Sequence, residues 1–174
     1  MRRPLRTTSL REAGFTLLEI MVVVLIIGII ITFATLSLGN RALDSQLEDE
    51  ANRLYQLFAV ATEDADVQGL ELGWRYLPDG YEFLVLNQGT WQPFTAGPLR
   101  TRSLPNALYI DLNVDGRAIA PASEGEKTSE PQVLLLSSGE SSPFRLDLHA
   151  HGYRPYIRVE GDALGRLSRK RFEE

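Results

Sequence analysis

The pattern of apolar and polar positions divides the chain into three stretches. From Phe15 to Leu38 the sequence runs 24 residues with one charged residue, Glu19. As a helix this stretch would be about 36 Å long, enough to cross a hydrocarbon core of about 30 Å. Its β-branched run would favour a strand in water, but in lipid a helix satisfies its own backbone hydrogen bonds. The pattern therefore predicts a membrane-spanning helix over residues 15–38.

The second stretch continues the helix with a different pattern. Apolar residues recur at steps of three and four, which places them on one side of a helix: Leu43, Leu47, Ala51, Leu54, Phe58, Ala61 and Ala65. Polar residues such as Asp44 and Glu48 lie mainly off this side, and Gly69 is a typical helix stop. We expect an amphipathic half of the helix over residues 39–69, with its apolar side packed on a sheet.

After Gly69 the apolar period changes to two. Short alternating runs end at turn residues every 8–12 positions, which is typical of a small antiparallel β-domain. The expected strands are LELGWRY, YEFLVL, ALYIDLNV, QVLLLS, FRLDLHA and YIRVEG, with a short further run LGRL. Residues 117–131 are polar and contain proline, so a mobile loop is expected there. Six or seven strands over residues 70–174 and the long N-terminal helix predict an α+β fold, the helix packing on an antiparallel sheet or sandwich.

Charge and composition narrow the classes of function. The chain of 174 residues has no cysteine and two histidines, so disulfides, thiol catalysis and cysteine-based metal sites are excluded. No catalytic arrangement stands out, and we predict a protein that is not an enzyme and needs no cofactor or metal. The net charge is −5, and residues 1–14 hold four Arg and one Glu, so the remainder carries −8. Such an acidic body argues against nucleic acid as a partner.

The basic residues also predict an orientation in the membrane. Arg2, Arg3, Arg6 and Arg11 precede the apolar stretch, and only Arg41 closely follows it, which places the N-terminus in the cytoplasm. A secretory signal peptide is excluded, because the stretch is too long and ITFATLSLGN offers no small-residue cleavage site. A plain signal anchor fits the length, but it leaves an ionisable residue in the span unexplained.

The residues REAGFTLLE, from Arg11 to Glu19, resemble a type IV prepilin signal position for position. In the type IV pilin and pseudopilin family, a prepilin peptidase on the cytoplasmic face cuts after the glycine and N-methylates the new phenylalanine. The resemblance implies a leader at residues 1–14 that is removed, a cut between Gly14 and Phe15, and methylation of Phe15. Glu19 would then be the fifth residue of the mature chain.

A role for Glu19 follows from that processing. A carboxylate in hydrocarbon costs several kcal/mol unless it is paired. The cut creates a partner, the α-ammonium of Phe15, on the same subunit or on a neighbour in a filament. Glu19 would thus set the axial register as subunits leave the membrane and stack their helices. A glutamate that simply sits near the membrane interface remains the alternative.

Across its whole length the chain resembles the H-type minor pseudopilins of type II secretion systems. The resemblance is carried by LEDEANRLYQLFAVATEDADVQG, DGYEFLVLNQGTWQPF, LLLSSGESSPFRLDL and YIRVEGDALGRL. It implies a structural subunit near the tip of a periplasmic pseudopilus that helps export folded proteins across the outer membrane. The implied partners are other minor pseudopilins, the major pseudopilin, the prepilin peptidase, the inner membrane and secreted cargo. The implied location is the inner membrane, with the β-domain in the periplasm, and the pseudopilus after assembly.

Two further patterns have spacings found in metal sites. Asp111, Asn113 and Asp115 with Gly116 match the opening of a calcium loop, but its closing glutamate would fall on Ala122. A strand that ends in an Asp-Gly turn is the preferred interpretation, although the major pseudopilins of this family do bind calcium. Three residues would share one strand face at a spacing that can hold a metal: Asp147, His149 and His151. Arg145 lies on the same face, which favours a solvated outer face.

The C-terminus places four cations in six residues: Arg166, Arg169, Lys170 and Arg171. We expect a frayed, solvated tail or a docking patch for an acidic neighbouring subunit. The alternative is a type IV pilus minor pilin that binds DNA through this tail.

Overall fold

The computed structural model describes residues 16–123 and 130–173, without the side chains of residues 33–40. The chain divides into two compact units, residues 1–39 and 40–174. One helix, α1 (Leu17–Gln68), is followed by ten strands in the described residues. Within these residues, no helix combines the length and the apolar character that a membrane crossing needs. The span predicted over residues 15–38 includes positions that lie outside this description.

The end of α1 has a clear local cause. Gly69 follows the last helical residue with a φ of 67°, a left-handed conformation that glycine adopts without strain. The N–H of Leu70 donates back to the carbonyl of Ala65 at 3.0 Å, which satisfies a carbonyl at the helix end. The helix therefore ends where the sequence predicts its stop.

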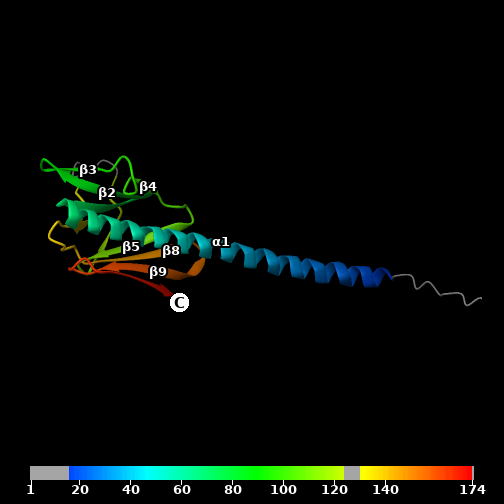
Figure 1. The fold of residues 1–174 in the computed structure, drawn as a ribbon. Helices are drawn as coiled ribbons and strands as arrows, with labels where there is room; N and C mark the ends of the chain where they lie inside the picture. The colour runs from blue at the N-terminus through cyan, green and yellow to red at the C-terminus, as the bar shows by residue number, and fades with distance from the viewer. Residues whose placement is uncertain (1–15, 124–129, 174) are drawn as a thin grey trace, which may run out of the picture. The chain divides into compact units, whose positions relative to one another are not determined.

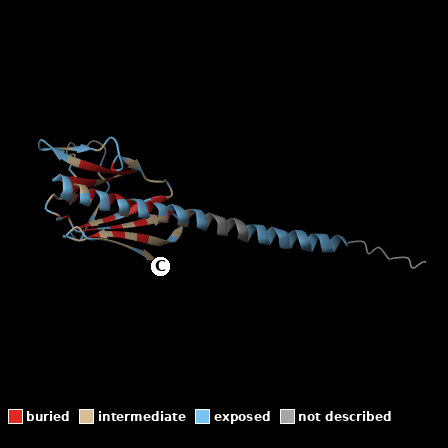
Figure 2. Ribbon diagram, viewed as in Figure 1, coloured by how far each residue is buried: buried red, intermediate tan, exposed pale blue. Residues whose placement is uncertain are grey.

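The buried side of α1 in the unit 40–174 is the predicted apolar stripe. Six of its residues are fully buried: Leu47, Ala51, Leu54, Phe58, Ala61 and Ala65. Leu43 is partly buried against the same core, and Leu57 joins it. Figure 2 shows this buried side alternating with exposed positions along the helix. The apolar stripe of the sequence is thus the side of α1 that lies in the core of this unit.

The strands form two antiparallel sheets. The first sheet has the order β3-β2-β1-β7, with β4 paired to β2. Its strands are β1 (Leu72–Leu77), β2 (Gly80–Asn87), β3 (Thr90–Pro93), β4 (Arg102–Ser103) and β7 (Val133–Leu135). The second sheet has the order β10-β9-β8-β5-β6. Its strands are β5 (Leu108–Val114), β6 (Arg117–Ile119), β8 (Phe144–Ala150), β9 (Tyr153–Gly161) and β10 (Leu167–Phe172).

Within the unit 40–174, α1 lies between the two sheets (Figure 1). The ring of Phe58 joins all three layers. Its centroid lies 5.4 Å from that of Trp74 and 5.5 Å from that of Phe83 in the first sheet, and 4.5 Å from that of Phe144 in the second. Aromatic pairs at these spacings add to the burial of apolar area. The α+β fold predicted from the sequence is confirmed.

The strand count differs from the expectation of six or seven. Strand β6 lies at the start of the stretch predicted as a loop, where it is the return arm of the Asp115-Gly116 turn. Strand β10 lies in the predicted tail. Leu167 packs against the core, but the next residues on that side are Arg169 and Arg171, so the sequence shows no apolar alternation there. Strands β3 and β4 have four and two residues, too few to set a period.

Candidate assembly site

Thr16 and Glu19 define the start of α1. The Thr16 hydroxyl accepts a hydrogen bond from the Glu19 N–H at 3.2 Å, as an N-cap residue does. The sequence T-x-x-E is also the pattern of a capping box. The cap places Glu19 in the first helical turn, where the helix dipole favours a negative charge.

The surroundings of Glu19 are apolar and uncovered. The neighbouring side chains of Leu17, Leu18, Ile20 and Met21 are 50–81% exposed, and Glu19 itself is exposed. Exposed apolar side chains on this scale mark a surface that contacts lipid or protein. Once this surface is covered, the carboxylate loses its water and needs a positive partner.

Two of the three predicted site residues cannot be placed. Gly14 and Phe15, which flank the predicted cut, lie outside the described residues. Processing between them, and pairing of the Phe15 ammonium with Glu19, therefore stay predictions.

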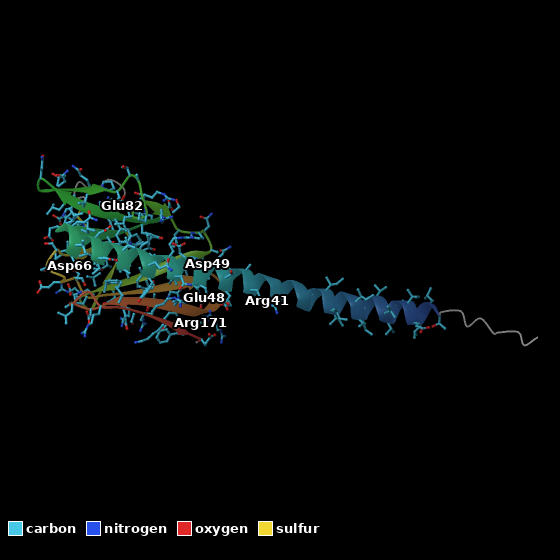
Figure 3. All side chains as sticks on the ribbon, viewed as in Figure 1. Arg41, Glu48, Asp49, Asp66, Glu82 and Arg171 are labelled. Atoms are coloured by element: carbon cyan, nitrogen blue, oxygen red, sulfur yellow. The ribbon has the colours of Figure 1, made fainter. Side chains whose placement is uncertain are left out.

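A second group of charged residues joins the helix to the C-terminal strand. Arg171 donates to Asp44 at 2.7 Å and to Glu48 at 3.0 Å, and Arg169 also pairs with Glu48. The Tyr153 hydroxyl donates to Asp44 at 2.8 Å. We call these five residues the tail clamp; Figure 3 labels Glu48 and Arg171, which come from α1 and β10.

The geometry of the tail clamp follows from the periods of its two elements. Asp44 and Glu48 are one helical turn apart, about 6 Å along the axis. Arg169 and Arg171 are two strand residues apart, about 6.6 Å, and point to the same side of β10. Hydrogen bonds from Arg171 and then from Tyr153 hold the pKa of Asp44 below its ordinary value. The carboxylates of Glu173 and Asp44 raise the pKa of Arg171.

The expectation of a frayed C-terminal tail is wrong. Residues 167–172 form β10, which pairs with β9 along its whole length. Lys170 pairs with Glu160 at 3.2 Å, and Arg166 with Asp162 at 2.7 Å. Each of the four tail cations thus has an acidic partner within the chain.

The calcium-like stretch is a strand that ends in the Asp115-Gly116 turn, as preferred from the sequence, but the turn leads into strand β6 where a loop was predicted. Asp115 and Gly116 have φ angles of 50° and 78° and connect β5 to β6 through the Val114–Arg117 pair. Two central residues with positive φ are typical of a tight hairpin turn. Across the described ranges, no three His, Cys, Asp or Glu residues are arranged to hold a metal.

Asp147, His149 and His151 do lie on an outer face of the second sheet, but they interact with neighbouring strands rather than with one another. Asp147 accepts two hydrogen bonds from Arg158, at 2.6 and 2.8 Å. The His149 ring stacks between other rings, with centroid distances of 5.0 Å to Tyr109 and 4.8 Å to Tyr156. His151 stacks on the other side of Tyr109 at 4.8 Å.

Sequence reasoning missed the cap at Thr16 and the pairs of the tail clamp. The T-x-x-E pattern was available as a signal for the cap. Acids four apart on a predicted helix, and cations two apart in a possible strand, were a signal for the clamp. That signal needed β10 to be recognised as a strand.

A capped N-terminal helix with exposed apolar residues, continuing as the buried helix of an antiparallel β-domain, defines a protein of the pilin-like class. The Prokaryotic N-terminal methylation motif family model matches residues 9–35. A Type II secretion system protein H of Pseudomonas aeruginosa is 40% identical over 147 residues, covering 80% of this chain and 84% of the relative. The corresponding protein of Aeromonas hydrophila is 31% identical over 176 residues, covering 94% and 96%. The chain belongs to the family of type II secretion system protein H.

Solved structures agree on the fold. The minor pseudopilin EpsH from the Type 2 Secretion System of Vibrio cholerae superposes with a TM-score of 0.59 at 24% identity, covering 72% of this chain and 96% of that one. The solution structure of Escherichia coli GspH gives a TM-score of 0.55 at 17% identity, covering 72% and 88%. At these identities the likeness concerns the fold alone.

Proposed function

We propose that this chain is a minor pseudopilin of a type II secretion system. It would act as a structural subunit near the tip of a periplasmic pseudopilus that helps export folded proteins across the outer membrane. The observation that carries the proposal is the match to protein H relatives over most of the chain, together with the methylation motif at residues 9–35. The role is architectural and involves no catalytic step.

Maturation would begin at the cytoplasmic face of the inner membrane. A prepilin peptidase would remove residues 1–14, cutting between Gly14 and Phe15, and would methylate the new N-terminus. Residues 15–38 would remain as the membrane-embedded and later the assembly part of the helix. The exposed apolar side chains between Leu17 and Ile31 support burial of this part, in lipid first and then among neighbouring helices.

Assembly would give Glu19 its partner. A carboxylate covered by apolar neighbours needs a positive charge nearby, and the Phe15 ammonium of the same subunit or of a neighbour supplies one. The unit 40–174 would then stand in the periplasm, where its surfaces meet other minor pseudopilins, the major pseudopilin and secreted cargo.

Deletion of the gene tests this function. We expect the exported proteins to accumulate in the periplasm, and the full-length chain supplied in trans to restore their release into the medium. Pilus-dependent traits such as twitching and DNA uptake serve as the control and should not change. Normal secretion with loss of a pilus trait would overturn the proposal in favour of a pilus minor pilin.

A further inference from the structure

A groove runs between the second half of α1 and two loops of the unit 40–174. Its volume is about 850 Å³. The helix contributes Tyr55, Thr62, Glu63 and Asp66 to its lining, and the loops contribute Glu140 and Leu164. Figure 3 labels Asp66 near the C-terminal end of the helix.

The charged residues that line this groove are all acidic. Glu63, Asp66 and Glu140 line it, and no lysine, arginine or histidine does. In the part of the chain that the structure describes, none of these three acids forms an ion pair, whereas the acids of the tail clamp and of the outer sheet face do. The groove therefore has a negative charge that its own surroundings do not neutralise.

The position of two of these acids adds to that charge. The carbonyl end of a helix is partially negative and is stabilised by cations. The last turn of α1 contains no basic residue and instead contains Asp66, with Glu63 one turn earlier. This arrangement is locally unfavourable in the isolated chain, and a cation brought from outside would relieve it.

An exposed apolar side chain also lines the groove, and a second one follows a groove residue in the chain; this is an independent observation. Val67 and Leu164, exposed by 75% and 65%, are the most exposed large apolar side chains among the described residues of the unit 40–174. Leu164 lines the groove, and Val67 follows Asp66 in the chain. The Asp162 carboxylate accepts hydrogen bonds from the N–H groups of Leu164 and Arg166, at 2.9 and 3.0 Å, and fixes this loop. Apolar groups of this kind, grouped beside charges, are typical of a protein interface.

We propose that this groove docks a segment of a neighbouring pseudopilin that carries an arginine or lysine beside an apolar side chain. The proposal rests on the proposed function, which supplies the neighbour. Charge complementarity selects the cation, because three unneutralised carboxylates line the groove. The exposed Leu164 selects a protein segment over a bare metal ion, which would leave this side chain in water. The same carboxylates repel the phosphates of a nucleic acid.

Charge reversal in the full-length chain tests the proposal in cells with a complete secretion system. The double variant Glu63→Lys and Asp66→Lys should lower release of the exported protein at least tenfold, with normal amounts of the processed chain in the membrane. Because the new cations lie at the negative end of a helix, this variant should melt no earlier than the wild type. Loss of stability could therefore not explain the loss of secretion.

The matched control is Asp49→Lys. Asp49 is an exposed acid of the same helix that does not line the groove. Its reversal should leave secretion within twofold of the wild type. Equal secretion by the Glu63/Asp66 variant and the wild type would overturn the docking groove. It would leave the proposed function intact, since gene deletion tests that separately.

A thiol placed in the groove tests direct contact. The chain has no cysteine, so Ala59→Cys gives a single label site in the groove lining, and Gln88→Cys gives one in the exposed β2–β3 turn. Co-expression of the other pseudopilins should protect Cys at 59 from a maleimide at least fivefold, and the charge reversal should abolish this protection. The site at 88 should label equally throughout. Unchanged labelling at 59, or protection of the chain alone by calcium, would overturn the proposal.

Discussion

Two glutamates of α1 have different roles because the surroundings of their carboxylates differ. Glu50 is 1% exposed and accepts a hydrogen bond from the Tyr81 hydroxyl at 2.6 Å, with Arg53 as its ion-pair partner. The Glu50 carboxylate thus has its hydrogen-bond and ion-pair partners within the folded chain. Through Tyr81 it links α1 to the first sheet. Glu19 is exposed among apolar side chains. Under the proposed function, its partner would be the α-ammonium of Phe15, of the same subunit or of another one.

Replacing Glu19 by alanine tests the assembly role. The variant should be processed normally, because the cut lies five residues away. Secretion should fall by roughly tenfold or more, because the α-ammonium of Phe15 has lost its carboxylate partner. Immunoblots of the membrane fraction measure processing, and an exported enzyme in the medium measures secretion. Glu19→Gln is the isosteric control and should fail in the same way. Secretion at the wild-type level by both variants would show that the Glu19 carboxylate has no role in assembly.

Replacing Tyr81 by phenylalanine tests the buried pair. The change leaves a buried carboxylate of Glu50 without one of its donors, which should lower the free energy of unfolding by about 1–3 kcal/mol. Burial, and then the hydrogen bond to Glu50, raise the pKa of Tyr81 above its ordinary value. Urea unfolding of the full-length chain measures the loss. Tyr109→Phe, at a half-exposed ring of the outer face, should change stability by less than about 0.5 kcal/mol.

At the scale of elements, the tail clamp connects α1 to the last strand. It joins residues far apart in the sequence through matching spacings on a helix and a strand. The pairs are partly exposed, with Arg171 and Glu48 showing 28% and 32% of their side chains, so solvent weakens each one. The tail clamp contributes to stability mainly because Arg171 makes several of these bonds at the same time.

Removing Arg171 tests the tail clamp. Arg171→Ala should cost about 1–2 kcal/mol of stability at pH 7, since several partly exposed bonds are lost together. The pKa of Asp44 is lowered in the folded chain, so its contribution is complete above its unfolded pKa and is lost as pH falls through the folded pKa. The difference between wild type and variant should therefore be full at pH 7 and shrink in strong acid. A double-mutant cycle with Asp44→Ala should give a coupling near 1 kcal/mol; independent effects of the two changes would contradict the clamp.

The sequence predicted those elements whose structure is determined by the local pattern of apolar, polar and turn residues. The stripe from Leu47 to Ala65 and the Asp115-Gly116 turn were both predicted, because local period and turn chemistry determine them. Strand β10 was not, because its inward Arg169 and Arg171 face acids of the helix rather than an apolar core. A pattern of apolar alternation cannot detect a strand whose side toward the helix is mainly ionic.

Among the residues of the site, too, local features could be predicted from the sequence and contacts between distant residues could not. The position of Glu19 in the first helical turn follows from local capping by Thr16. The pairing of Asp44 with Arg171 depends on contacts across more than a hundred residues, which no local pattern contains. The one-sided charge of the groove likewise depends on which loops lie beside Glu63 and Asp66 in space.

At the scale of the whole molecule, some surfaces are neutralised or covered by the chain's own residues and others are not. The outer face of the second sheet is largely neutralised by its own ion pairs, and its rings stack on one another. The apolar residues from Leu17 to Ile31 and the acidic groove at the end of α1 are not satisfied. A subunit that assembles through these two surfaces would leave the sheet face free for other contacts.

The most direct test of the account is the mass of the mature chain isolated from a strain with its own prepilin peptidase. The account predicts a polypeptide that begins at an N-methylated Phe15 and lacks residues 1–14. Gly14→Val is the matched control and should retain the leader in the membrane fraction. A mature chain that begins at any other residue, or a Gly14→Val chain that matures normally, would contradict the account.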